Sequence, residues 1–439
     1  MNDTASEVLH FVEENDVKFV RLAFTDIFGT MKNISIMADE LPRALEDGIT
    51  FDASAVPGFM NVEESDLFLC PDPGTLAVLP WRPQQGRVVR LLCDIRHPDG
   101  SVFEGDGRSV LKKAQEKAAG LGLCCQIGAE CEFYLFEADE DGRPTTKPMD
   151  RGGYLDVAPA DKGENVRREI CFTLEDMGIK PESSRHEQGP GQNVIDFRYS
   201  DALTAADNVV TFKTVVRTVA AANGLFASFM PKPIWNMSGN GLHVNMSLFR
   251  NGQNIFKSSA QEHCQEAESF IAGVLRRIRE ITAFLNPITN SYARLGKFEA
   301  PKYVTWSHQN RSQLIRIPAA KGDKVRMELR SPDPVCNPYF AFALLIHAGL
   351  EGIEQQLPLC PPANVNLYSA PAQVLQGVES LPATLEEAVG LAQSSEFVKS
   401  TLPNKTIQKY WERQLALCDK YARAVDKDAF EHAQYFNDV

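Results

Sequence analysis

Three strand-like segments alternate between charged and apolar side chains, and this pattern restricts the fold more than any other feature. Residues two apart on a strand point to the same face, so each segment has a charged face backed by an apolar one. The charged faces hold Glu130 and Glu132 in "AECEF", His243 and Asn245 in "LHVNM", and Arg326, Glu328 and Arg330 in "RMELR". Burying like charges together is costly unless a cation lies against them.

Each segment has a simpler interpretation when it is taken alone. The two glutamates could face water, the "RMELR" charges could form a surface ion-pair ladder, and His243 could be a satisfied core histidine. The recurrence of the pattern favours a shared polar cavity lined by carboxylates and one imidazole. These groups are the ligands that divalent metals use.

A second signal is a local reversal of charge between Arg294 and Arg330. This region holds nine Lys or Arg and three acidic residues, in a chain of net charge −13. Arginine grips phosphate and carboxylate groups through paired hydrogen bonds. Beside a carboxylate cluster, the arginines favour a nucleoside triphosphate with its divalent cations over a solvated basic patch. The chain has no Walker A loop and no GxGxxG motif, which argues against P-loop and Rossmann sites.

Composition excludes several classes of protein. The net charge of −13 argues against nucleic acid as a partner. The most apolar run, residues 339–350, is too short to cross a membrane. The acidic N-terminal stretch is unlike a signal peptide, and the ten cysteines lack metal-finger spacing. We therefore expect a cytoplasmic protein with free thiols and no membrane partner.

The order of the elements predicts an α+β fold in two domains. Residues 17–37 are typical of two strands around a turn, and further short strands follow to about residue 102. From there strand-like segments alternate with amphipathic helical ones. We expect a small domain at residues 1–102 and a catalytic domain at residues 103–439.

A series of motifs along the chain resembles the glutamine synthetase family, type I, the bacterial-type glutamate–ammonia ligases. In order they are "FTDIFGTMKNISI", "FDASAVPGF", "GAECEFYLF", "GGYLDVAPAD", "RHEQGPGQNVIDF", "MPKPIWNMSGNGLHVNMSL", "NSYARLGKFEAP", "NRSQLIRIP" and "RMELRSPDPVCNPY". The resemblance covers essentially the whole chain. It implies an N-terminal β-grasp domain followed by a catalytic domain whose curved antiparallel sheet, a half-barrel, is backed by helices.

The resemblance also implies an activity and its partners. Family members phosphorylate the γ-carboxylate of glutamate with ATP, and ammonia then displaces phosphate from γ-glutamyl phosphate to give glutamine. We therefore expect an ATP-dependent ligase of nitrogen metabolism that uses glutamate, ammonium and two or three Mg²⁺ or Mn²⁺ ions per active site. The expected assembly is a homododecamer of two hexameric rings, with active sites between subunits.

The resemblance assigns a role to each expected site residue. The metal ligands are Glu130, His243 and Glu328 for the ion that bridges the ATP phosphates, and Glu132 and Glu187 for a second ion. Glutamate is expected to contact Ser238, Gly239, Arg294 and Arg330. ATP is expected to contact Glu182, Tyr199, Ser247, Arg311, Arg316 and Arg326, with Arg311 also catalytic. Ammonium is expected between Asp52, Tyr154 and Glu187, with Asp52 as the proton acceptor. Glu299 lies on a loop expected to keep water from the acyl phosphate.

The chain departs from the family pattern at the second metal. The family usually has His-His-Glu, then Pro-Gly-Gln, and then a second Glu as a third carboxylate. Val194 stands at the position of that Glu. A hard cation with fewer anionic ligands binds more weakly, so the second site is in doubt. Asp196 and Gln192 share a strand face with Val194 and could partly compensate.

Smaller departures concern the substrate pockets. Ser238 replaces an expected Asn, Ala55 replaces an expected Ser, and the loop from Arg294 to Glu299 is one residue shorter than usual. The "NLY" at residues 366–368 resembles an adenylylation site without its acidic flank, so we do not expect that regulation. Two alternatives remain: a γ-glutamyl ligase for another amine, and a homologue of low or no activity that acts in nitrogen sensing.

Overall fold

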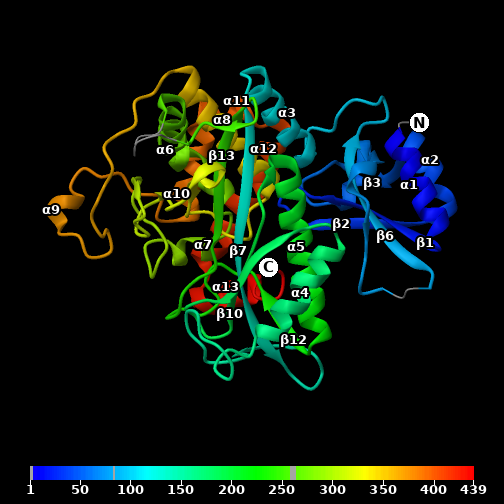
Figure 1. Ribbon diagram of the computed structural model, residues 1–439, viewed down its shortest axis with the longest axis horizontal. Helices are drawn as coiled ribbons and strands as arrows, with labels where there is room; N and C mark the ends of the chain where they lie inside the picture. Colours follow the sequence, from blue (N-terminus) through cyan, green and yellow to red (C-terminus); the bar gives the residue numbers. More distant parts are fainter. Residues whose placement is uncertain (1–2, 83–84, 258–263) are drawn as a thin grey trace.

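The N-terminal part of the chain forms a separate six-stranded sheet, at the blue end of the ribbon in Figure 1. The computed structural model describes residues 3–82, 85–257 and 264–439. The elements of this small unit are α1 (Asp3–Glu14), β1 (Val17–Thr25), β2 (Met31–Met37), α2 (Leu41–Asp47), β3 (Ile49–Asp52), β4 (Asp66–Pro71), β5 (Ala77–Val78) and β6 (Arg87–Arg96). The first and last long strands, β1 and β6, pair in parallel at the centre, which is the expected β-grasp arrangement.

The predicted turn between β1 and β2 is confirmed, and it touches the rest of the chain. The Asp26 carboxylate accepts hydrogen bonds from the backbone N–H groups of Phe28 (3.0 Å) and Thr30 (2.9 Å). Gly29 has a φ of +82°, and a Cβ there would lie 2.8 Å from the Cα of Asn337. Glycine is therefore required both by the backbone conformation and by the close approach.

A larger, antiparallel-dominated sheet of eleven strands forms the second unit. Its main path runs β15-β16-β17-β13-β7-β10-β9. The strands are β7 (Cys124–Ala138), β8 (Pro144–Pro148), β9 (Pro181–His186), β10 (Gln192–Phe197), β11 (Ser200–Asp201), β12 (Leu225–Ser228), β13 (Leu242–Arg250), β14 (Gln253–Asn254), β15 (Trp306–His308), β16 (Ile315–Ile317) and β17 (Met327–Leu329). The long strand β7 lies at its centre, between β13 and β10. The sheet curls into the expected half-barrel.

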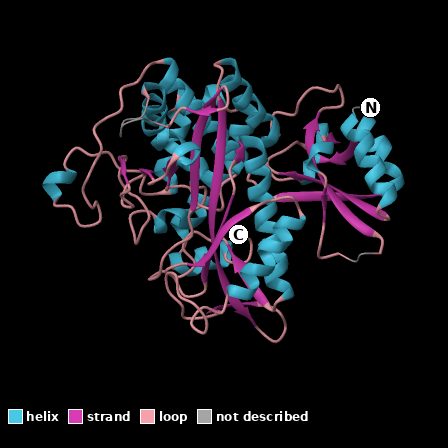
Figure 2. Ribbon diagram, viewed as in Figure 1, coloured by secondary structure: helices cyan, strands magenta, loops and turns pink. Residues whose placement is uncertain are grey.

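Helices surround this sheet, as the cyan ribbons of Figure 2 show. They are α3 (Gly107–Gly120), α4 (Glu164–Asp176), α5 (Ala202–Ala222), α6 (Gln265–Leu285), α7 (Thr289–Arg294), α8 (Pro338–Glu354), α9 (Ala372–Leu375), α10 (Leu385–Ser394), α11 (Glu396–Thr401), α12 (Asn404–Arg423) and α13 (Lys427–Tyr435). None of the helices in the described ranges is long and apolar enough to cross a membrane. All ten cysteines are free thiols, as expected.

The alternation in β7 explains how the sheet builds both a core and a site. Ile127, Ala129, Cys131 and Phe133 are buried on one face, and α5 packs against this strand. The Phe133 ring lies 6.0 Å from a phenylalanine ring of α5, measured between centroids. The opposite face, which carries the glutamates of "AECEF", is therefore free to line a polar site.

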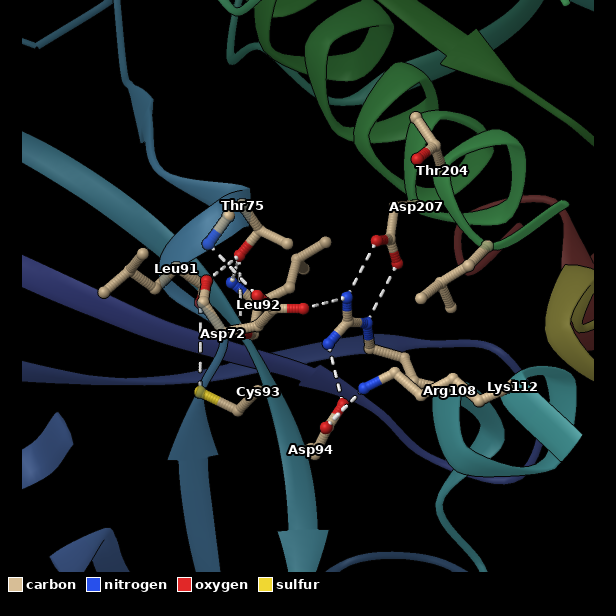
Figure 3. Close-up of polar contacts among 12 residues, drawn as sticks. Asp72, Thr75, Leu91, Leu92, Cys93, Asp94, Arg108, Lys112, Thr204 and Asp207 are labelled. Atoms are coloured by element: carbon tan, nitrogen blue, oxygen red, sulfur yellow. Dashed lines mark hydrogen bonds and ion pairs between the residues drawn. The ribbon is translucent and has the colours of Figure 1, made fainter. Parts of the chain in front are cut away.

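A buried ion network around Arg108 joins the two units (Figure 3). Arg108 lies at the start of α3, and its side chain is 3% exposed. Its Nη1 donates to Asp94 of β6 (2.7 Å), and its Nη2 donates to Asp72 of the small unit (2.9 Å). The Nε and Nη2 atoms donate to Asp207 of α5 (3.2 and 3.1 Å). One guanidinium group thus ties the small unit to the helices behind the large sheet.

Candidate active site

His243, Glu130 and Glu328 meet on three neighbouring strands of the large sheet. His243 of β13 pairs with Glu130 of β7, and β17, which carries Glu328, pairs with β13 on its other side. His243 Nδ1 lies 3.7 Å from Glu130 Oε1 and 3.5 Å from Glu328 Oε1. This Nδ1 is buried, and none of the described residues forms a hydrogen bond with it. Burial and the charge of Arg330 lower the pKa of His243, which favours the neutral imidazole that binds metals. The three residues therefore fit a divalent cation, which would satisfy Nδ1.

A cavity of about 270 Å³ opens on one side of Glu130. Four of the residues assigned to ATP line it, namely Glu182, Tyr199, Ser247 and Arg326. Arg326 Nε donates to Asn245 Oδ1 (2.8 Å), which fixes the guanidinium at the wall of the cavity. The cavity offers a flat aromatic ring and a cation, the groups that a nucleotide base and phosphates need.

A narrower cavity of about 30 Å³ opens on the other side of the same glutamate. The predicted site residues that line it are Glu130, Glu132, Glu187, Ser238, Gly239, His243, Arg294, Glu299, Arg311 and Arg330. Its wall is strongly polar and carries both signs of charge. Because Glu130 borders both cavities, groups bound in the two would meet beside the Glu–His–Glu cluster.

Two buried arginines hold the wall of the narrower cavity. Arg294 Nη1 donates to the carbonyl of Ser331 (2.8 Å), and its Nη2 donates to the carbonyl of Arg330 (3.0 Å). Arg330 Nη1 in turn donates to Glu328 Oε1 (2.7 Å). Arg316, which lies outside the lining residues, reaches Glu328 Oε2 (2.6 Å). The cluster carboxylate is therefore fixed from both sides by guanidinium groups.

Glu132 and Glu187 both line the narrower cavity, and their negative charges interact. Burial, followed by the charge of Glu187, raises the pKa of Glu132 to about 8. Burial also raises the pKa of Glu187 to about 7, against the opposing effect of Arg185. Glu132 Oε2 accepts a hydrogen bond from the backbone N–H of Gly241 (2.6 Å). The pair would attract a cationic ligand such as ammonium.

Sequence reasoning missed Arg185, which lies among the predicted metal ligands. Its guanidinium forms ion pairs with Glu130 (2.5 Å), Glu187 (3.0 Å) and Asp196 (2.8 Å). The signal was present in "RHE", because Arg185 and Glu187 are two residues apart at the end of a strand. Of the two possible replacements for a carboxylate at position 194, Gln192 donates to the Gly239 carbonyl, and Asp196 accepts from Arg185 through its Oδ2. Asp196 Oδ1 is buried and forms no hydrogen bond with the described residues.

A second cluster with metal-like spacing is a structural network. Asp150, Asp161 and His186 lie together and are buried. His186 Nε2 lies 3.0 Å from Asp150 Oδ1, and its Nδ1 lies 2.7 Å from the carbonyl oxygen of Glu187. Asp161 pairs with Arg167 (2.5 Å). These groups satisfy one another and hold the chain that carries Glu187 into the site.

Four predicted residues line neither cavity. Arg316 and Glu328 pair with each other beside the cluster, whereas Asp52 and Tyr154 lie elsewhere. Asp52 ends β3 in the small unit, and its carboxylate accepts hydrogen bonds from the N–H (2.9 Å) and hydroxyl (2.6 Å) of Ser54. These hydrogen bonds lower the pKa of Asp52. Tyr154 is 47% exposed. Among the described residues of this single chain, neither side chain lines a cavity of the site.

The site has two cavities that share Glu130, beside a Glu–His–Glu cluster that could hold a divalent cation. Comparison with known proteins gives the family. The family description "Glutamine synthetase, beta-Grasp domain" matches residues 16–98, and "Glutamine synthetase, catalytic domain" matches residues 104–433. The chain is 48% identical over 429 residues to the glutamine synthetase of Clostridium saccharobutylicum, with 96% of each chain covered. It is 47% identical over 427 residues to that of Methanosarcina mazei, again with 96% of each covered.

Solved structures agree with these relatives. A GmaS/ADP complex superposes with a TM-score of 0.87 at 30% identity, covering 99% of both chains. The glutamine synthetase of Plasmodium falciparum superposes with a TM-score of 0.86 at 25% identity, covering 98% of both. The chain belongs to the glutamine synthetase family. It is a ligase of glutamine biosynthesis, and its family uses ATP and divalent metals.

Proposed function

We propose that the larger cavity binds ATP and the narrower one binds glutamate, so that the reaction passes through γ-glutamyl phosphate. The observation that carries this proposal is that Glu130 borders both cavities. The γ-phosphate and the γ-carboxylate would then meet at the Glu–His–Glu cluster. Residues 1–102 and 103–439 are proposed as the β-grasp and catalytic domains.

Each charged group has a proposed task in this reaction. Arg294 and Arg330 would hold the carboxylates of glutamate, and Arg311, Arg316 and Arg326 would face the phosphates. Ser238 and Gly239 would contact the bound glutamate. A divalent cation held by Glu130, His243 and Glu328 would neutralise charge on the phosphate oxygens. The guanidinium groups would stabilise charge that grows on the phosphoryl group.

The ammonium site is proposed to form between subunits. Asp52 would accept the proton of ammonium, with Tyr154 and Glu187 as the other ligands. The distance of Asp52 from the cavities of its own chain supports a neighbouring subunit as its source. The family resemblance supports the proposal of a cytoplasmic homododecamer of two hexameric rings.

A second candidate is ligation of another amine to glutamate. Ser238 lines the substrate cavity where the family has Asn, and Ala55 stands in place of a Ser. Smaller groups leave room for an amine larger than ammonia.

The test is to supply ATP, Mg²⁺ or Mn²⁺ and glutamate with ammonium or a panel of alkylamines, and to follow phosphate release. We expect turnover with ammonium, and turnover only with an alkylamine would contradict the proposal.

Arg326→Ala should raise the KM for ATP by about 10- to 100-fold, because a hydrogen bond to a charged group contributes roughly 1.5–3 kcal/mol. The guanidinium lines the nucleotide cavity, and Asn245 fixes its direction. The KM for glutamate should change little. Steady-state kinetics with each substrate varied in turn gives both values. Arg168→Ala, at an exposed arginine of α4, is the matched control. Equal rises in both KM values would argue against a nucleotide role.

Glu299→Ala should uncouple ATP cleavage from glutamine formation and lower the rate of glutamine formation by about 10- to 100-fold. Glu299 lines the substrate cavity, and its carbonyl accepts a hydrogen bond from Arg330 Nη2 (3.2 Å). The loop before it is anchored by Lys232 over the Phe298 ring (4.1 Å). A shortened side chain admits water to the acyl phosphate. Phosphate and glutamine are measured together, and equimolar products in the variant would contradict this role.

A further inference from the structure

The Arg185 guanidinium lies among three carboxylates next to the expected second metal site. Its Nη2, Nε and Nη1 atoms reach Glu130 (2.5 Å), Glu187 (3.0 Å) and Asp196 (2.8 Å). Its side chain is 21% exposed, and none of the three acids exceeds 25%. One fixed cation therefore meets three largely buried carboxylates at charge-assisted hydrogen-bond distance. Carboxylate oxygens are also ligands that divalent metals use.

The strand register explains how the guanidinium fits there. Val194 of β10 lies opposite Arg185 of β9 on one side and opposite Glu132 of β7 on the other. Val194 is completely buried. An apolar side chain thus occupies the position between the cation and Glu132. A carboxylate at this position would lie beside the guanidinium and pair with it.

The remaining oxygen donors do not make a second metal shell. Glu132 Oε2 already accepts the Gly241 N–H, and Glu187 Oε1 accepts Arg185 Nε. The Gln192 side-chain amide donates to the Gly239 carbonyl (3.1 Å), so this amide is held by a backbone group. Arginine stays charged at any accessible pH. Beside Glu187, its charge opposes a divalent ion that has only Glu132 as a further carboxylate. The residues present do not fit a second divalent cation.

The charges of Arg185 and Val194, compared with the family pattern, agree with the replacement of a divalent cation by Arg185. Against the family pattern, Arg at position 185 in place of His adds one positive charge. Val at position 194 in place of Glu removes one negative charge. The two changes together supply the charge of one divalent ion. The Glu130, His243 and Glu328 cluster differs in its chemistry, because it adds an imidazole whose buried Nδ1 forms no hydrogen bond with the described residues.

We propose that Arg185 is a built-in cation that replaces the second divalent metal, so that each subunit binds one Mg²⁺ or Mn²⁺ in the absence of nucleotide. Arg185 acts as a positioning residue, since it holds Glu187 at the substrate cavity and Glu130 between the two cavities. Its charge at the site does not depend on the metal concentration. The inference rests on the proposed function in one respect, namely that Glu130, His243 and Glu328 bind the first metal.

The test counts Mn²⁺ ions bound to nucleotide-free protein, from the electron paramagnetic resonance signal of free Mn²⁺ during a titration. We expect one ion per subunit in the wild type and two in the double variant Arg185→His/Val194→Glu. Val194→Glu alone should keep one ion, because Arg185 pairs with the new carboxylate. Arg168→His, which adds a histidine at an exposed position of α4, is the matched control and should also keep one.

Two ions per wild-type subunit would overturn the inference, as would a folded double variant that binds only one. The wild-type count needs no variant, so it decides the question even when the double variant fails to fold. His243→Asn should remove the single ion, and an ion retained there would also overturn the inference. A wild type that binds one ion but makes no glutamine would contradict the proposed function and leave the role of Arg185 standing.

Discussion

Glu328→Gln is expected to lower the kcat of glutamine formation by about 10²- to 10³-fold, the usual effect of losing one electrostatic group at a reacting centre. The Glu328 side chain is 3% exposed and lies between Arg316 (2.6 Å) and Arg330 (2.7 Å). Its Oε1 is also 3.5 Å from His243 Nδ1. Glutamine keeps the shape but loses the negative charge. The cluster then has one carboxylate fewer for a cation, and two guanidinium groups lose their shared partner.

Two measurements separate this effect from a general loss of structure. The affinity for Mn²⁺ in nucleotide-free protein should fall together with kcat, while the unfolding midpoint in urea reports on folding. Glu116→Gln, at an exposed glutamate of α3, is the matched control and should change neither quantity. Unchanged Mn²⁺ affinity in a folded Glu328→Gln variant would remove Glu328 from the metal site.

Arg108→Ala is expected to lower the free energy of unfolding by about 3–5 kcal/mol, the usual effect of breaking a buried ionic network on one side. The substitution leaves Asp72, Asp94 and Asp207 without the guanidinium that they share. These acids come from both units, so the contact between the β-grasp sheet and α5 should weaken as well. Urea unfolding at fixed protein concentration measures the change.

An exposed arginine of the small unit provides the control for Arg108. Arg43 pairs with Glu40 at 2.8 Å, but both side chains are more than half exposed. Surface pairs of this kind contribute about 0–1 kcal/mol, so Arg43→Ala should have little effect. Equal losses in the two variants would mean that the network around Arg108 does not hold the units together.

The sequence predicted the architecture well because local patterns determine it. The two strands and the turn of residues 17–37 lie as expected, since Asp26 and Gly29 specify that turn locally. The alternation around Glu130 and Glu132 correctly indicated one packed and one polar face. Because the same charged-face pattern recurs in three segments, the sequence predicted that their charged faces line one cavity. These faces meet because β13 pairs with β7 on one side and with β17 on the other.

The arrangement within the site was harder to predict, because it depends on contacts between distant strands. Arg185 shares a face with Glu187, but only the register of β9, β10 and β7 brings it beside Val194 and Glu130. The sequence shows that position 194 lacks the expected carboxylate. It does not show that the Arg185 guanidinium lies beside that position. Asp52 is proposed to serve the active site of a neighbouring subunit. The sequence pattern of one chain does not describe that contact between subunits.

Ligation of ammonia to glutamate through an acyl phosphate transfers an oxygen atom from glutamate to phosphate, and isotope labelling detects that transfer. Glutamate labelled with ¹⁸O in its γ-carboxylate is incubated with the protein, ATP, Mg²⁺ and ammonium, and phosphate and glutamine are analysed by mass spectrometry. We expect one labelled oxygen to enter phosphate for each glutamine formed, because the carboxylate oxygen attacks the γ-phosphorus and leaves with phosphate when ammonia displaces it. Phosphate without the label, or no ammonium-dependent glutamine, would contradict it.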